Sequence, residues 1–361
     1  MKVFQDNQIY LFQRYGGVSR YFVELNDALV KLRTNDIYKV VAPIHFNAHL
    51  SEKRGKWGYI PVTSDLMNFN QRIRKISDSL SKKYYQVEKP ELIHETYYKN
   101  DDNWPRSIPR ITTIHDLIRE KITFSQSKIE KKLNSIKRSE KVICVSENTK
   151  RDLLEYYPFI EESKVSVVYV GVNRDVFNFT QLENRNNQIV YVGHRDGYKN
   201  FTVLLQAFSV SKLLRKEMKL VVFGGGSFSK EENDYIEKMN LRNVIIKVDG
   251  DDKKLASVYR ESLAMVYTSK YEGFGSPVLE SMSSGCVVLA NRTPALIEAG
   301  GSSAIYFDGE DVNSLIYELE NLICSNEKVI DLRKKGIERV KNFTWETTAQ
   351  KTRIIYNDVI S

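Results

Sequence analysis

The amino-acid sequence predicts an α/β protein with two doubly wound domains, each built on a parallel β-sheet. Short apolar runs alternate with helical patterns along the chain, which is typical of βα repeats. The series is interrupted by the polar, unpatterned segment 173–188 and then restarts. A chain of 361 residues, 42% hydrophobic and 28% charged, is long enough for two globular domains. We therefore expect residues 173–188 to form a linker.

The expected strands form one set before the linker and one set after it. The first set comprises residues 3–4, 38–42, 92–94, 111–114, 142–145 and 165–170. The second set comprises residues 189–193, 220–223, 244–248, 263–267, 287–290 and 304–307. In open parallel sheets, ligands bind beyond the carboxyl ends of the strands. The candidate binding motifs below fall at such ends.

Composition excludes several classes of protein. No apolar run approaches the roughly 18 residues that a membrane-spanning helix needs, and the N-terminal stretch is too polar for a secretion signal. Cys144, Cys286 and Cys324 lie in or beside apolar runs without metal-ligand spacing, so we expect buried thiols in a reducing cytosol. The few histidines form no cluster with cysteine at metal-site spacing. The sequence therefore predicts a cytoplasmic protein without a metal.

The net charge of +8 is confined to the first half of the chain. Residues 1–173 hold 29 Lys and Arg against 21 Asp and Glu, whereas the remainder holds 25 of each. This excess favours an anionic partner, either a membrane surface, a phosphorylated acceptor or nucleic acid. Part of it lies on an expected helix at residues 68–85. That helix either packs on the core with a solvated basic face or binds an anionic lipid surface.

The stretch YEGFGSPVLESMSSG, residues 271–285, predicts a tight loop followed by a short helix. The two glycines of the loop permit a close turn. Ser276 is a good N-cap, and Pro277 suits the first helical position, where no N–H is needed. Gly285 fits just past the end of the helix.

Two carboxylates flank this helix start, with Glu272 in the loop and Glu280 in the expected first turn. The N–H groups of Val278 and Leu279 are expected to be unpaired at the positive end of the helix dipole, which suits a phosphate. Together these groups could hold a phosphate flanked by hydroxyl groups. The alternative is that Glu280 only complements the dipole and that Glu272 is a surface charge.

Two further segments carry candidate anion ligands. In YGGVSRYF, Gly16 and Gly17 allow the backbone to approach a ligand at a helix start, although a plain β-to-α turn explains them equally well. In VYVGHRDGYKNF, Arg195 and Lys199 follow a strand-end glycine. Two cations at that position could neutralise a diphosphate, and the alternative is a solvated basic turn.

Three other segments have simpler explanations. In TTIHDLIRE, His115 ends an apolar strand, where it is either structural or a ligand contact. The segment FGGGSFS lacks the Lys-Ser/Thr ending of a P-loop and is interpreted as a flexible exit from a strand. In VSENTKRDLLEYY, capping alone explains Ser146.

In order, the segments GGVSRYF, TIHDLI, VSENTKRDL, YVGHRDGYKNF and YEGFGSPVLESMSSGCVVLA resemble family 4 of the retaining glycosyltransferases. The resemblance spans nearly the whole chain and is greatest to bacterial enzymes of O-antigen, capsule or exopolysaccharide synthesis, several of which are mannosyltransferases. It implies the GT-B fold, in which two Rossmann-like domains face a cleft. The expected parts are an acceptor-binding domain at 1–172, the linker, a nucleotide-sugar-binding domain at 189–342, and a helix at 343–361 packing back on the first domain.

The resemblance also implies roles for the residues around the two glutamates. Glu272 is expected to contact hydroxyls of the donor hexose, and Glu280 to accept hydrogen bonds from the nucleotide ribose. The helix start between them is expected to face the diphosphate. The other donor-binding positions are expected to be Gly16, Gly17, Gly273, Phe274, Gly275, Val278 and Leu279.

Arg195 and Lys199 correspond to the family's basic pair on the diphosphate. Many relatives place Arg directly after the strand-end glycine, where this chain has His194, so the role passes to Arg195. His115 corresponds to the His of the family's HD pair, near the donor hexose and the acceptor. The catalytic set implied by the resemblance is thus His115, Arg195, Lys199 and Glu272.

Breaking the bond from sugar to phosphate develops negative charge on the departing nucleoside diphosphate. Positive groups aimed at that diphosphate would then be the main contribution to catalysis. We expect no metal and no other cofactor, because these groups already supply positive charge. The acidic pairs Asp101–Asp102 and Asp251–Asp252 lie in polar loops and are expected to be solvated.

The expected function is transfer of a hexose, from GDP-mannose in preference to a UDP-sugar, to a saccharide or lipid-linked saccharide acceptor. We expect peripheral contact with an anionic membrane at its cytoplasmic face. A nucleotide-sugar epimerase on a related scaffold would share the donor site, as would a non-catalytic nucleotide-sugar-binding subunit. No nucleic-acid-binding motif accompanies the basic half, so no nucleic-acid partner is expected.

Overall fold

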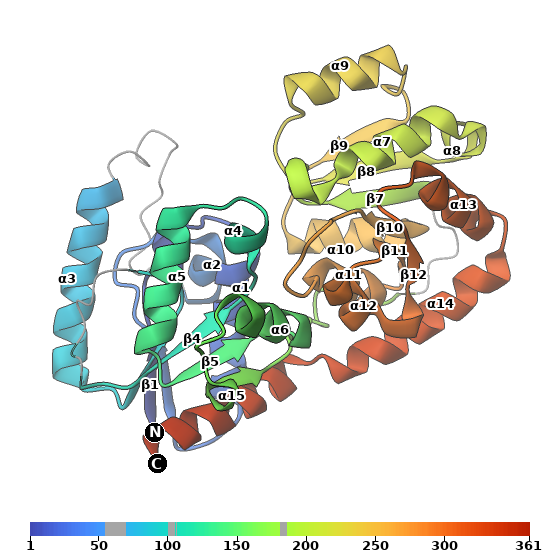
Figure 1. Cartoon of the computed structure of the whole chain (residues 1–361). Coiled ribbons are helices and arrows are strands. Elements are labelled where there is room, and N and C mark those ends of the chain that lie inside the picture. The colour runs from blue at the N-terminus through green and yellow to red at the C-terminus, as the bar shows by residue number, and fades with distance from the viewer. Residues whose placement is uncertain (55–69, 100–104, 106, 181–185) are drawn as a thin grey trace. The chain divides into compact units, whose positions relative to one another are not determined.

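The computed structural model describes residues 1–54, 70–99, 105, 107–180 and 186–361. The chain divides into two compact units (Figure 1): unit 1 comprises Met1–Gly171 with Trp345–Ser361, and unit 2 comprises Val172–Thr344. Each unit contains a six-stranded sheet whose neighbouring strands are all parallel. All the expected strands are present, with ends that differ from the expected ones by at most 3 residues. The predicted fold class is confirmed.

The sheet of unit 1 has the strand order β2-β1-β3-β4-β5-β6. Its strands are β1 (Lys2–Gln5), β2 (Ile37–Val40), β3 (Leu92–Glu95), β4 (Arg110–Ile114), β5 (Lys141–Cys144) and β6 (Val165–Val167). The chain adds β2 on one side of β1 and the remaining strands on the other. The direction of winding therefore reverses between β1 and β3, and the carboxyl ends at such a switch point are where doubly wound sheets bind ligands.

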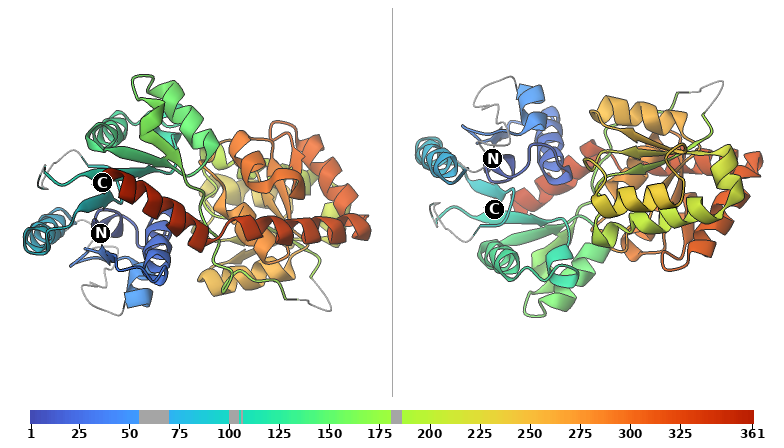
Figure 2. Two further views of the ribbon diagram at one scale, coloured as in Figure 1. Left: turned by 90° about the horizontal axis from the view of Figure 1, so that it is seen from below. Right: turned by 90° about the horizontal axis from the view of Figure 1, so that it is seen from above.

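The helices of unit 1 connect these strands and include the last helix of the chain. They are α1 (Gly17–Lys31), α2 (Ala48–Arg54), α3 (Asn70–Glu88), α4 (Ile118–Lys121), α5 (Gln126–Arg138), α6 (Glu147–Tyr156) and α15 (Trp345–Ile360), with short turns η1 (Ile9–Leu11) and η3 (Glu162–Lys164). Both views of Figure 2 show α15 alongside the rest of unit 1. The Tyr356 hydroxyl lies 2.7 Å from His94 Nδ1, and the Trp345 ring packs 5.6 Å from Tyr21.

The sheet of unit 2 has the order β12-β11-β10-β7-β8-β9, so its switch point lies between β7 and β10. Its strands are β7 (Gln188–Val192), β8 (Lys219–Phe223), β9 (Ile245–Val248), β10 (Ala264–Tyr267), β11 (Val287–Asn291) and β12 (Ile305–Phe307). Its helices and turns are η4 (Gly197–Lys199), α7 (Phe201–Val210), α8 (Lys212–Glu217), α9 (Lys230–Lys238), α10 (Asp252–Glu261), α11 (Ser276–Ser283), α12 (Pro294–Gly300), η5 (Gly301–Ser303), α13 (Val312–Ile323), α14 (Asn326–Arg339) and η6 (Val340–Asn342).

Parallel strands covered on both faces are mostly apolar along their length, and the central strands of unit 2 follow this rule. The core of unit 2 includes the strand residues Tyr191, Val222 and Val266, all fully buried. Residues 173–180, in the expected linker, are grouped with unit 2. Phe177 is buried there, and its carbonyl accepts a hydrogen bond from Ser283 Oγ.

One expectation about burial is wrong, because Cys324 is exposed, although Cys144 and Cys286 are buried as expected. Of the two interpretations of the helix at 68–85, packing of its apolar stripe on the core does not hold for α3, because Ile76 is 53% and Leu80 43% exposed. The residues of α3 that face inward are instead Ser77, Ser81 and Tyr85. No helix among the described residues is long and apolar enough to cross a membrane.

Candidate active site

A lysine and a glutamate meet at the switch point of unit 2. Lys199 ends the turn η4 after β7, and Glu272 follows β10, which pairs with β7. Lys199 Nζ lies 2.5 Å from Glu272 Oε1. The two side chains are 16% and 12% exposed, so the pair is largely shielded from water and still reachable by a ligand. The structure thus joins two residues that the sequence placed in separate motifs.

The backbone around Lys199 is held in one conformation. Gly193, directly after β7, has φ 105°, and Asn200 has φ 53°, a left-handed conformation that asparagine tolerates. Thr268 Oγ1 donates to the carbonyl of Lys199 at 2.6 Å, and Asn200 Nδ2 donates to that of Gly309 at 2.9 Å. These bonds tie the loop after β7 to loops from other strands. The ammonium group of Lys199 is therefore preorganised.

Tyr267 is a member of this site that the sequence motifs did not reveal. It ends β10 and donates its hydroxyl to Glu272 Oε1 at 2.9 Å. Burial and then the charge of Glu272 raise the pKa of Tyr267 well above its usual value, so the phenol stays protonated. The signal in the sequence was an aromatic hydroxyl at the carboxyl end of a predicted strand.

The helix start between the two glutamates is shifted by one residue from the expected position. Helix α11 begins at Ser276 with Gly275 as its N-cap, so Pro277 is in the second helical position. Gly275 has φ 101°, and a Cβ there would lie 2.7 Å from Leu296 Cδ2, so glycine is required. The N–H of Val278 donates to the Gly275 carbonyl at 2.9 Å and is not unpaired as expected.

Glu280 lies deeper in α11 than expected. It is the fifth residue of the helix, beyond the first turn, and is 4% exposed. The side chains of Phe274, Val278 and Leu279 are also buried, so only their backbone groups could serve a ligand. Gly285 follows the helix with φ 69°, as its position in the sequence predicts.

Arg195 is directed to a different place from Lys199. Its Nε lies 2.8 Å from Glu232 Oε1, and its Nη2 donates to the carbonyls of Gly226 and Ser227 at 3.2 and 2.7 Å. Nη1 donates to the carbonyl of Gly224 at 3.2 Å, and the side chain is 4% exposed. Each of the three guanidinium nitrogens of Arg195 therefore already donates to a protein group.

The glycine-rich segment after β8 is held by these contacts and is not a loose exit from the strand. Gly224, Gly225 and Gly226 all have φ near 72°. A Cβ on Gly225 would lie 2.3 Å from the carbonyl oxygen of Gly193, so the two loops approach as closely as glycine allows. Glu232 completes the arrangement, because its other oxygen accepts from the Ser229 N–H at 2.7 Å in a capping box.

Gly16, Gly17 and His115 belong to unit 1. Gly16 is the N-cap of α1, and a Cβ there would clash with the side chain of Gln13, whose Oε1 accepts from Ser19 N–H at 3.0 Å. His115 follows β4 and is packed edge-on against Tyr21, with ring centroids 4.8 Å apart.

Burial lowers the pKa of His115 to about 4, so the ring is neutral at pH 7. Its Nε2 is buried and has no hydrogen-bond partner among the described residues. Buried polar atoms are nearly always bonded. The unsatisfied nitrogen therefore favours a ligand contact over the purely structural explanation.

The acidic pairs do not form a metal site in the described part of the chain. Asp251 is the N-cap of α10 and accepts from the N–H of Lys254 at 2.9 Å, which explains its presence. The pair Asp101–Asp102 lies outside the described residues. Within the described residues, no group of three His, Cys, Asp or Glu side chains has the arrangement of a metal centre.

Comparison with protein families covers both units. Residues 173–339 match the model of the glycosyl transferases group 1, and residues 15–176 match that of glycosyltransferase family 4. The chain is a family 4 glycosyltransferase. Each unit of the structure therefore corresponds to one of the two conserved parts of this family.

Relatives of this glycosyltransferase include proteins with assigned activities. It is 28% identical over 265 residues to an uncharacterized glycosyltransferase of Methanocaldococcus jannaschii, covering 70% of this chain and 69% of the relative. It is 26% identical over 198 residues to the O-antigen chain mannosyltransferase RfbU of Salmonella typhimurium, covering 52% of each chain. It is 28% identical over 167 residues to O-antigen chain mannosyltransferase B of Escherichia coli, covering 45% of this chain and 44% of the relative. The matches span about half the length of the two mannosyltransferases.

Solved structures share the whole fold of this glycosyltransferase. A glycosyltransferase from Rickettsia africae has a TM-score of 0.73 at 20% identity, covering 100% of this chain and 98% of that one. Anabaena HepE in complex with UDP and glucose has a TM-score of 0.75 at 16% identity, covering 99% and 100%. At these identities the likeness shows the fold, which is GT-B.

Proposed function

We propose that this glycosyltransferase moves a hexose, with retention of its anomeric configuration, from a nucleoside-diphosphate sugar to a saccharide or lipid-linked saccharide of a surface polysaccharide. The observation that carries the proposal is the Lys199–Glu272 pair at the switch point of unit 2. GDP-mannose is the first donor to test, because two relatives are named O-antigen chain mannosyltransferases. A UDP-sugar is the second, because HepE has the same fold and its structures hold UDP and UDP-glucose.

Lys199 would bind the diphosphate in this scheme. An ammonium has three donors, and one of them is directed to Glu272 at 2.5 Å. A second donor is directed to the Tyr267 hydroxyl at 3.5 Å, and phosphate oxygens would approach from the partly exposed side of the pair. As the sugar–phosphate bond breaks, charge grows on those oxygens, and a fixed cation stabilises that state more than the ground state.

Glu272 would orient the hexose. Its Oε1 already accepts from Lys199 and Tyr267, which keeps the carboxylate fixed in position. The remaining acceptor capacity of this carboxylate suits two neighbouring sugar hydroxyls. Glu280 would take the nucleotide ribose, and the start of α11 would direct its dipole at the diphosphate.

We also infer that the reaction needs no metal and that the enzyme works at the inner face of the cell membrane. Lys199 and the helix start would supply positive charge to the diphosphate.

The membrane contact is supported by α3, which carries the exposed apolar residues Ile76, Leu80 and Val87 among exposed lysines. A helix with an exposed apolar stripe and a basic surface suits an anionic lipid interface.

The proposal is tested by thermal-shift measurements with GDP-mannose, UDP-glucose, ADP-glucose and dTDP-glucose. A ligand that binds only the folded protein at 100 times its dissociation constant stabilises it by about 2.7 kcal/mol. We expect GDP-mannose to raise the melting temperature most, and Lys199→Ala to abolish that rise. Lys216→Ala is the matched control, because Lys216 is 83% exposed in the same unit.

The product must also be identified, because an epimerase would share the donor site. We expect donor consumption with an acceptor to yield a glycoside, and incubation without acceptor to yield no epimerised sugar nucleotide. If no sugar nucleotide stabilises the protein, or if the donor is epimerised in the absence of acceptor, the proposed function is wrong.

A further inference from the structure

Exposed aromatic rings lie at the switch point of unit 1. Phe12 and Tyr15 follow β1 and Tyr97 follows β3, so they leave the two strands between which the sheet reverses. Phe12 is 43% and Tyr15 60% exposed. The rings of Phe12 and Tyr97 are 5.3 Å apart and tilted by 45°. An exposed ring packed on the half-buried Tyr97 at a ligand-binding edge indicates a recognition surface.

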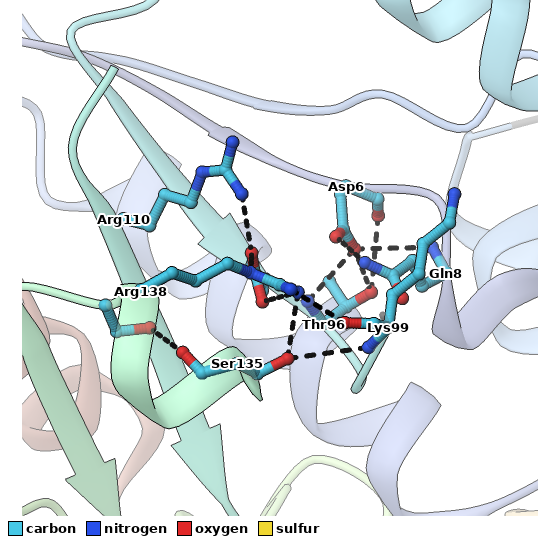
Figure 3. A network of polar contacts seen from close by, with 9 residues as sticks. Asp6, Gln8, Thr96, Lys99, Arg110, Ser135 and Arg138 are labelled. Carbon is cyan, nitrogen blue, oxygen red and sulfur yellow. Dashed lines mark hydrogen bonds and ion pairs between the residues drawn. The ribbon is translucent and has the colours of Figure 1, made fainter. Parts of the chain in front are cut away.

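The backbone that carries these rings is fixed by polar contacts. Asn47 Nδ2 donates to the carbonyl of Gln13 at 2.6 Å, next to Phe12. On the other loop, Arg138 Nη1 donates to the carbonyl of Lys99 at 2.7 Å (Figure 3). The same guanidinium is paired with Glu95 at 2.7 Å. A ligand bound to a surface held in this way orders few groups, so little affinity is lost.

A guanidinium lies against this aromatic surface. Arg74 Cζ is 4.2 Å from the centroid of the Phe12 ring. Its Nε is buried and has no hydrogen-bond partner among the described residues. Asp78, one helical turn away, is already paired with Lys99 at 2.6 Å and accepts from Asn7 at 3.2 Å. The charge of this partly buried guanidinium is thus incompletely compensated, and an anion bound at its outer nitrogens would gain free energy.

Contacts inside unit 1 connect the aromatic rings to the HD segment. The rings of Tyr97 and Tyr98 are stacked with centroids 5.0 Å apart. Lys132 Nζ lies 5.4 Å from the centroid of Tyr98 and donates to the carbonyl of Asp116 at 2.8 Å. Asp116 adjoins His115, whose buried Nε2 is unbonded within the described residues. Tyr98 and the buried Lys132 therefore connect Tyr97, through the interior of unit 1, to the segment that carries His115.

We propose that Phe12, Tyr97 and Arg74 form an acceptor subsite for a saccharide that carries a phosphate or carboxylate group. The inference rests on the proposed transferase function. The C–H hydrogens on the face of a sugar ring are attracted by the negative face of an aromatic ring. The planar guanidinium of Arg74 suits a phosphate or carboxylate oxygen pair. The surface thus selects a ligand that is both a sugar and an anion.

The test measures binding of saccharides to the full chain by isothermal calorimetry, without donor. The probes are mannobiose, mannobiose 6-phosphate and a glucuronic-acid disaccharide, so that the neutral sugar and the two kinds of anion are separated. The variants are Phe12→Ala and Arg74→Gln. Phe159→Ala and Lys137→Gln are matched controls, because Phe159 is 58% exposed in unit 1 with Lys137 Nζ 5.7 Å from its ring centroid.

We expect at least one anionic probe to bind the wild-type chain more tightly than mannobiose. Arg74→Gln should weaken that probe by about tenfold or more and leave mannobiose unchanged, as loss of one charge-assisted contact does. Phe12→Ala should weaken both classes, and the two control variants should weaken neither. Equal binding of neutral and anionic probes, or equal effects of the test and control variants, would overturn the subsite.

Donor stabilisation is measured on the same variants. It depends on unit 2 and should be unchanged in all four of them. Saccharide binding that fails while GDP-mannose still stabilises the chain refutes the subsite alone. Absence of stabilisation by any donor refutes the proposed function, whatever the saccharides do.

Discussion

Lys199 makes two electrostatic contributions with one ammonium group. In the free enzyme it neutralises Glu272 at 2.5 Å, and in the proposed transition state it faces the departing diphosphate. Lys199→Ala removes both contributions, whereas Lys199→Arg keeps the charge in a different shape. We expect Lys199→Ala to lower kcat about 100-fold or more, as loss of one preorganised donor does in comparable sites.

The size of the expected decrease in kcat is consistent with the low exposure of the Lys199–Glu272 pair. A 100-fold change in rate corresponds to about 2.7 kcal/mol of transition-state stabilisation. Both side chains are mostly buried, so the charge acts through a medium in which it is weakly screened. The effect on folding should be smaller, about 1 kcal/mol, since Tyr267 still donates to Glu272 in the variant.

The assay is initial-rate measurement at saturating donor, with circular dichroism to show that the variant is folded. Lys199→Arg should recover part of kcat, because the cation is retained at a site that favours a point charge. A folded Lys199→Ala enzyme with kcat within about threefold of wild type would remove Lys199 from the diphosphate site and refute this reasoning.

Four further outcomes are expected. Arg195→Ala should also lower kcat about 100-fold. Glu232→Gln should reproduce part of that loss, because Glu232 holds Arg195 against the glycine-rich segment, and unchanged rates in the two variants would contradict a role for either residue. Activity should persist in EDTA, and a complete loss that Mg²⁺ restores would contradict metal independence. The chain should sediment with phosphatidylglycerol vesicles at low salt and dissociate at high salt, since each basic residue near the surface contributes about 1 kcal/mol; equal binding to neutral vesicles would disprove an electrostatic contact. Burial lowers the pKa of His94 to about 3 and that of His115 to about 4, from 6.5 in the unfolded chain. The unfolded chain therefore binds more protons below pH 6.5, so the free energy of unfolding decreases as the pH falls. The raised pKa of Asp6, about 6, acts in the opposite direction, leaving a net loss of about 3 kcal/mol at pH 5; identical urea midpoints at pH 8 and pH 5 would show that this sign is wrong.

The fold was predictable because burial on both faces leaves a strand few polar positions. Runs such as Leu220–Phe223 are apolar throughout, and a run of this length between loops predicts a buried parallel strand. The α3 helix shows the limit of this reasoning. Its apolar residues recur at helical spacing, yet the inward face is formed by Ser77 and Ser81, and Ser77 accepts from Asn7 at 2.9 Å.

Site residues could be predicted where a single loop contains the motif. The prediction was incomplete where a side chain is positioned by contacts with a second loop. Lys199 and Glu272 each follow a predicted strand, so their proximity could be inferred from parallel topology. The direction of Arg195 could not be inferred, because it depends on Glu232 and on carbonyls that only the folded segment after β8 presents. The N-cap at Gly275 was missed because Ser276 has the stronger intrinsic preference.

Unit 1 is built from one segment that precedes unit 2 in the sequence and one that follows it, and this has a consequence for biosynthesis. The helix α15 supplies Tyr356 to His94 and Trp345 to Tyr21, but the ribosome makes it only after the whole of unit 2. Translation adds roughly 5–20 residues per second, so unit 1 waits many seconds with that face uncovered. Unit 2 is continuous in sequence and can complete its core first. We therefore expect chaperones to bind the part of unit 1 that is synthesised first. Unit 2, although it is synthesised later, can fold before unit 1 is complete.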